Sequence, residues 1–198
     1  MEKASKSSLW TEEGYELFAA EGLDGIQVER LSRILQLNKS SFYHYFVDME
    51  GFCHELIQLH RKKIDLLLLD VLEIKKLDPD YLLLLVRYTS TVMFQVQLTR
   101  NKDQYSFYDA STEIDLRVSH GVRHLWVDYL GSNANSEHVM RYYDFVRDMF
   151  YTRVSFRNFN FQFLYNLITD AKVLIDQVNE RVSPGTAKTH SRHLDDSV

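Results

Sequence analysis

The segment KSSFYHYF, in the first quarter of the chain, contains the residue types best suited to chemistry with nucleic acid. Lys39, Ser40 and Ser41 are predicted at the N-terminus of a short helix, where backbone N–H groups and the helix dipole favour a phosphate. Tyr43 and His44 can donate hydrogen bonds to phosphates from the exposed side of the same helix. These residues predict contact with DNA; the alternative is an ordinary solvated helix.

Two short helices must position these side chains. Apolar residues at i, i+3 and i+7 predict a helix over residues 28–35. A second short helix is predicted over residues 40–45, with Phe42 and Phe46 on its buried side. Gln36–Asn38 forms the turn between them. Two short helices joined in this way are a helix-turn-helix.

The charge of the whole chain argues against a general nucleic-acid binder. Its net charge is -5 and its pI is about 5.9, whereas proteins that bind nucleic acid without specificity are usually basic. Between residues 27 and 47, however, Arg30, Arg33 and Lys39 face only Glu29. A modest basic patch on an acidic molecule is compatible with specific DNA binding.

The remainder of the chain is predicted to be helical, because Gly and Pro are scarce and strand-rich folds need turn residues about every 8–12 positions. We expect an all-α protein with an N-terminal three-helix helix-turn-helix domain (residues 1–48). A long helix joins it to a helical ligand-binding and dimerisation domain (49–182), and a polar, disordered tail follows (183–198). The other helices are predicted over residues 8–21, 49–76, 79–99, 111–130, 136–156 and 160–182.

Residues 81–130 combine many aromatic side chains with a few polar ones, which is typical of a small-molecule pocket. The alternative is that these residues form ordinary core. His120 and His124 lie at i and i+4, but no acid stands between them and no third ligand is evident, so we expect no metal site and no cofactor. The candidate pocket residues are Tyr88, Tyr105, Tyr108, Arg117, His120 and Trp126.

The last two predicted helices carry more apolar residues than two outer helices need. Pairing with their copies across a two-fold axis would form a four-helix bundle. We therefore expect a homodimer, although burial within one subunit is also possible.

Several classes of protein are excluded or disfavoured. The chain has no phosphate-cradling Gly loop, nucleophile elbow or metal-binding signature, so we expect that it is not an enzyme. Its single cysteine, Cys53, rules out an intrachain disulfide and fits a reducing compartment. The polar N-terminus lacks a signal-peptide core, and no stretch approaches the roughly 20 apolar residues of a membrane span. We expect a cytoplasmic protein with no membrane partner.

The segment GYELFAAEGLDGIQVERLSRILQLNKSSFYHYFVDMEGF resembles the TetR family of regulators, over about residues 9–56. The family's L-F-A-x-x-G pattern is present at Leu17–Gly22, and KSSFYHYF has the aromatic ending of its helix-turn-helix. The resemblance places Gln27 where the family usually has a Thr or Ser that caps the second helix and contacts phosphate. Gln36 and Met49 depart from the family pattern, which commonly has Gly in the turn and Lys at the start of the long helix.

The resemblance implies a transcriptional regulator that binds double-stranded operator DNA. It also implies a dimer with an effector pocket between the long helix and the helices after it. We expect a repressor that a small-molecule effector releases from a palindromic operator. The alternative is a helical dimeric small-molecule-binding protein of the same fold that has lost operator binding, which the acidic N-terminal half favours.

Overall fold

The computed structural model describes residues 6–131 and 136–182, and within these ranges every regular element is helical. The prediction of an all-α fold is confirmed. The tail predicted at 183–198 lies outside the described residues. The elements are α1 (Lys6–Glu21), η1 (Gly22–Ile26), α2 (Val28–Leu35), α3 (Lys39–Phe46), α4 (Met49–Leu72), η2 (Leu77–Tyr81), α5 (Leu82–Arg87), α6 (Thr89–Arg100), α7 (Phe107–Leu130), α8 (Ser136–Arg153) and α9 (Phe161–Val182).

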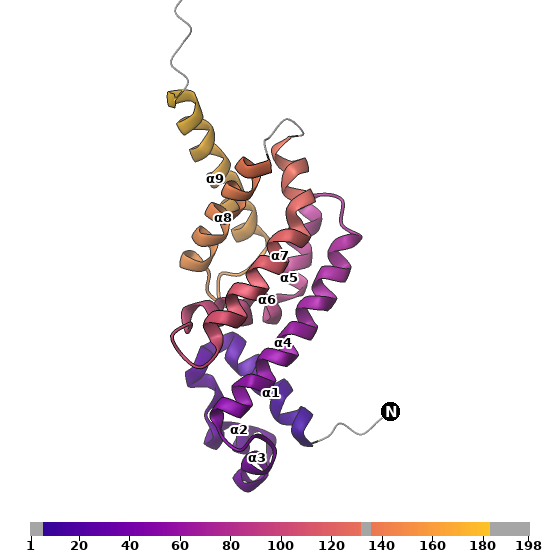
Figure 1. Ribbon diagram of the computed structural model, residues 1–198, viewed down its shortest axis with the longest axis vertical. Coiled ribbons are helices and arrows are strands. Elements are labelled where there is room, and N and C mark those ends of the chain that lie inside the picture. Colours follow the sequence, from indigo (N-terminus) through magenta and orange to yellow (C-terminus); the bar gives the residue numbers. More distant parts are fainter. Residues whose placement is uncertain (1–5, 132–135, 183–198) are drawn as a thin grey trace, which may run out of the picture.

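The molecule is elongated, with α2 and α3 at one end and α8 and α9 toward the other (Figure 1). Helix α4 connects the two regions; it has 24 residues, which corresponds to about 36 Å. Asp48 caps this helix, because its side chain accepts a hydrogen bond from the Gly51 backbone N–H at 2.8 Å. Helix α7 packs along α4. None of the helices in the described ranges combines the length and the apolarity needed to cross a bilayer.

The aromatic core is continuous from the N-terminal helices into the rest of the molecule. Helix α1 packs against both α4 and α6. The ring of Phe94 on α6 stacks on Tyr15 with centroids 4.3 Å apart and contacts Phe18 at 4.6 Å. A Cβ at Gly14 would collide with the Phe52 ring, so only glycine lets α1 approach α4 this closely. The helix-turn-helix is therefore packed directly onto the helices that follow it.

The single helix predicted over residues 79–99 is wrong: the range contains the end of η2 and then two separate helices, α5 and α6. The break lies at Tyr88, whose backbone (φ -94°, ψ 33°) leaves the helical region. Tyr88 Oη donates to Asp70 on α4 at 2.9 Å, and Thr89 Oγ1 donates to the carbonyl of Val86 at 2.6 Å. The break turns α6 toward α1, a long-range contact that local spacing does not encode.

Three predicted helix ends also shift. Helix α4 ends at Leu72 instead of residue 76, because the chain turns to bury Leu77. Helix α7 begins at Phe107 instead of residue 111, and the Phe107 ring is buried. Helix α8 ends at Arg153 instead of residue 156. Beyond it, Val154 is buried, and its carbonyl accepts a hydrogen bond from Arg100 at 2.6 Å.

Candidate nucleic-acid interface and ligand cavity

The turn between α2 and α3 is closed by backbone hydrogen bonds. The backbone of Gln36 is in the left-handed region (φ 54°, ψ 35°). At the end of a helix this conformation is most often adopted by glycine. The Leu37 N–H donates to the carbonyl of Ser32 at 3.0 Å, and the Ser32 hydroxyl donates to the carbonyl of Leu37 at 2.5 Å. Gln36 therefore takes the glycine position of the family pattern and retains the geometry of the turn.

Helix α3 is held by its capping residue and by a cluster of aromatic rings. The Asn38 side chain accepts a hydrogen bond from the Ser40 N–H at 3.0 Å. Phe42 is fully buried and contacts Trp10, Phe46 and Phe52, with ring centroids 5.0–5.3 Å apart. With this face buried, the opposite face of α3 is turned to solvent.

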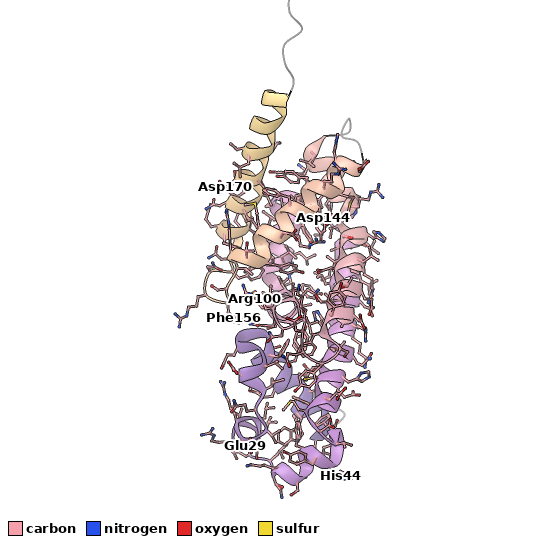
Figure 2. All side chains as sticks on the ribbon, turned by 60° about the vertical axis from the view of Figure 1, so that its left-hand side comes forward. Glu29, His44, Arg100, Asp144, Phe156 and Asp170 are labelled. Carbon is pink, nitrogen blue, oxygen red and sulfur yellow. The ribbon has the colours of Figure 1, made fainter. Side chains whose placement is uncertain are left out.

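The structure brings the predicted DNA-contacting residues of α3 onto one exposed tip. Ser40, Tyr43 and His44 are exposed, and about half of the Tyr43 side chain is open to solvent. Figure 2 shows His44 at the end of the molecule opposite Asp170 of α9. Tyr45 on the same helix is also exposed.

Ser41 and Gln27 are placed differently from the exposed contact residues of α3. Ser41 is half-buried, and its hydroxyl donates to the carbonyl of Asn38 at 2.8 Å. Gln27 is exposed in front of α2, but its side chain makes no capping hydrogen bond. Asn38 already accepts the N–H of Ser40, so less of the helix N-terminus is open to a phosphate than expected.

Two of the cations near the interface are paired within the chain, which the sequence did not predict. Lys39 Nζ lies 2.7 Å from Glu29 on α2, and the Arg30 guanidinium makes two contacts with Glu21, at 2.5 and 2.6 Å. The hydrogen bond from Lys39 lowers the pKa of Glu29. Arg33 is exposed and has no ion pair within residues 6–131 and 136–182. Exposed pairs are weak, so a phosphate can replace Glu29 as the partner of Lys39.

The junction between α3 and α4 is tight. Val47 has a positive φ (65°, with ψ -54°), which a β-branched residue rarely adopts, and the Asp48 N–H donates to the carbonyl of Phe46 at 2.7 Å. A Cβ at Gly51 would collide with the same carbonyl oxygen. This strained turn and the missing side chain at residue 51 set the direction of α3 relative to α4.

A separate cavity of about 120 Å³ lies among helices α4 to α9. Its walls are mainly apolar, with Gln95, Asp115 and Arg147 as the main polar groups. Of the six pocket residues predicted from the sequence, Trp126 lines this cavity. Its indole N–H is buried and has no hydrogen-bond partner among the described residues.

The structure does not bring the other five together. Tyr88 borders a different, shallow hollow, while Tyr105 and Tyr108 are exposed. Arg117 pairs with Asp65 and Glu113 on the surface, and His120 is exposed. Helical periodicity explains the difference on α7, since Asp115, Val118 and Trp126 face inward and residues 117 and 120 do not. In the described part of the chain, no group of three or more potential metal ligands comes together.

A chain of buried hydrogen bonds connects α1 to this cavity. Tyr15 Oη lies 2.8 Å from His60 Nδ1, and His60 Nε2 lies 3.0 Å from Gln95 Oε1. Gln95 Nε2 donates to Asp115 at 2.8 Å, so its oxygen must accept from His60. Burial lowers the pKa of His60 to about 3 and keeps the ring neutral, so Nδ1 accepts the Tyr15 proton. Tyr151 completes the chain by donating to Asp115 at 2.5 Å. We refer to these five residues as the buried relay.

The N-terminal region is similar to a known protein family. Residues 11–56 match the family described as bacterial regulatory proteins, tetR family, which agrees with the resemblance seen over residues 9–56. The matched segment contains most of α1, all of α2 and α3, and the start of α4. Searches of curated proteins and of solved structures gave no match. Residues 11–56 therefore form a helix-turn-helix region similar to the N-terminal domain of the tetR family of bacterial regulatory proteins, a family of DNA-binding transcriptional regulators.

Proposed function

We propose that this protein is a cytoplasmic, dimeric repressor that binds a palindromic operator and releases it when a small molecule occupies the cavity. One observation carries the proposal. The face of α3 that holds Ser40, Tyr43 and His44 is exposed at the tip of the molecule, while the opposite face is anchored by buried aromatic rings. A helix presented in this way fits the major groove.

Dimerisation is proposed through α8 and α9. Large apolar side chains remain exposed on these helices within one subunit, among them Phe145, Tyr165, Val173 and Leu174. Pairing of the two helices with their copies would cover such surface in a four-helix bundle. A two-fold dimer presents two copies of α3, which a palindromic operator requires, spaced about 34 Å apart.

The effector is proposed to act by shifting the population between two arrangements of the dimer. Helix α4 joins the cavity walls to the helix-turn-helix, and the buried relay reaches α1 from the same walls. A ligand that binds better to the arrangement with the wrong spacing of α3 releases DNA.

Footprinting of the full-length protein on the DNA that flanks its own gene tests the proposal. We expect a protected palindrome with half-sites one helical turn apart. Replacing Lys39 and Tyr43 together by Ala should weaken the footprint and flatten the salt dependence by about one to two units. The matched control replaces an exposed Lys and Tyr elsewhere, Lys62 and Tyr108, by Ala. Equal footprints for the two double variants would exclude α3 as the recognition helix.

The second candidate function is a small-molecule-binding protein of the same fold without operator binding. It is favoured by the ion pairs that occupy Lys39 and Arg30. Heparin chromatography separates the two candidates, because only a phosphate-binding interface gives retention that falls with salt and depends on Lys39.

A further inference from the structure

The charged and aromatic side chains of the cavity define the chemistry of its occupant. We propose that the cavity binds a small organic cation, an ammonium group on an apolar body, through the carboxylate of Asp115. This inference rests on the proposed role of the cavity as the effector site and specifies the class of effector.

Asp115 has unused capacity for a positively charged donor. Its Oδ1 accepts hydrogen bonds from Tyr151 at 2.5 Å and from Gln95 at 2.8 Å, whereas Oδ2 has no partner within the described ranges. Burial raises the pKa of this carboxyl group, and the hydrogen bonds from Tyr151 and Gln95 and the charge of the nearby Arg147 offset that effect only in part. A cationic ligand would supply further positive charge.

Arg147 is the one basic side chain among the described residues that line the cavity, and it shares its charge with carboxylates other than Asp115. Its guanidinium pairs with Asp144 at 2.9 Å and with Asp148 at 3.2 Å, both on its own helix. With Asp115, three carboxylates therefore surround a single guanidinium. The local excess of negative charge disfavours an anionic ligand and favours a cation.

Aromatic rings form much of the remaining wall. Five of them line the cavity, and aromatic faces attract organic cations through their quadrupoles. Burial raises the pKa of the Tyr81 and Tyr143 phenols, so these rings stay neutral. The five rings belong to Tyr81, Trp126, Tyr143, Phe150 and Tyr151.

The size of the cavity limits the apolar body. Its volume of about 120 Å³ is close to that of a protein cavity of about 150 Å³ that holds one benzene molecule.

Titration calorimetry with three ring compounds of the same size tests the proposal: benzylammonium (a cation), benzyl alcohol (neutral) and benzoate (an anion). We expect the full-length protein to bind benzylammonium about 10- to 100-fold more tightly than the other two, as a charge-assisted hydrogen bond in a buried site would give. D115N should remove this preference, because Asn keeps an acceptor for Gln95 and Tyr151 but has no charge. D109N, on the exposed face of the same helix, is the matched control.

The outcomes are separable. Unchanged affinity of D115N for benzyl alcohol shows that its cavity is intact, so a selective loss of benzylammonium binding supports the proposal. Equal binding of the three compounds by the unmodified protein, a preference for benzoate, or no binding of any of them at millimolar concentration overturns it without using the variant. None of these results touches the footprint on DNA, which tests the proposed function independently.

Discussion

His60 is a titratable side chain held neutral inside the protein. It is fully buried between Tyr15 and Gln95, and burial lowers its pKa from 6.5 to about 3. Below pH 6.5 the unfolded chain takes up a proton at this position and the folded chain does not. The folded state therefore loses stability as the pH falls from about 6.5 toward about 3.

We expect this histidine to contribute about 1 kcal/mol of lost stability between about pH 6.5 and pH 5.5. In His60→Gln the free energy of unfolding should therefore fall by about 1 kcal/mol less over this pH range than in the unmodified protein. Urea denaturation at each pH measures this difference. His54→Gln is the control, because His54 is exposed on the same helix. An equal slope in His60→Gln and in the unmodified protein would contradict this assignment.

In the proposed complex with operator DNA, Glu29 would compete with phosphate for Lys39, since the two side chains lie 2.7 Å apart. In Glu29→Gln the lysine is released, and we expect operator affinity at low salt to rise about 2- to 5-fold, because an exposed pair is weak. Fluorescence anisotropy with labelled operator measures this change.

A double-mutant cycle with Lys39→Ala identifies the cause. If Glu29 acts by holding Lys39, the gain disappears when Lys39 is absent. If the gain persists, Glu29 acts by repelling phosphate directly. Glu73→Gln, at the far end of α4, should have no effect and controls for net charge.

At the scale of elements, the turn between α2 and α3 carries conformational strain. Gln36 is left-handed with φ 54°, which costs a residue with a Cβ about 1–2 kcal/mol. Gln36→Gly should raise the free energy of unfolding by about 0.5–1 kcal/mol, after the greater flexibility of glycine in the unfolded chain is subtracted. Gln36→Ala, which keeps the Cβ, should give no such gain in urea denaturation. Equal stabilisation by Ala and Gly would show that the left-handed conformation is not the source.

At the scale of the whole molecule, the buried relay connects residues that share no direct contact. Tyr15 on α1 and Asp115 on α7 are connected by hydrogen bonds through His60 and Gln95. Hydrogen bonds in a chain polarise one another. We therefore expect Tyr15→Phe and Asp115→Asn to be non-additive by about 0.5–1 kcal/mol in the free energy of unfolding.

The control cycle combines Tyr15→Phe with Asp109→Asn. Because Asp109 lies outside the relay, the effects of these two substitutions on the free energy of unfolding should be additive. Additivity in both cycles would mean that the relay is only a set of separate buried hydrogen bonds. It would then give no physical link between the cavity and α1.

The proposed dimer can be tested on the same scale. A charged residue at Phe145 or Val173, as in Phe145→Glu or Val173→Glu, should convert a dimer into a monomer in sedimentation velocity, because the charge would be buried at the interface. Leu69→Glu is the control, since Leu69 is also a large exposed apolar residue but lies on α4. If the unmodified protein is a monomer, α8 and α9 are excluded as the interface. The same conclusion follows if the Phe145 and Val173 variants remain dimers like the control.

The amino-acid sequence alone determined the helical class, the helix-turn-helix and the family of its N-terminal region. These properties depend on local signals: apolar spacing over one or two turns, the Asp48 cap, and a run of residue types from Lys39 to Phe46. Neighbours within about four residues largely decide such features. The match to the tetR family over residues 11–56 follows the same segment.

Tertiary structure decided the break at Tyr88, the lining of the cavity, the ion pair of Lys39 and the buried relay. Each depends on contacts between residues far apart in sequence; the relay bonds of His60 join residues 45 and 35 positions away. On α7 the sequence indicated aromatic and polar groups but not which face pointed inward. In the structure Trp126 lines the cavity, whereas Arg117 and His120 do not. The packing of neighbouring helices, and not local spacing, determines which face is buried.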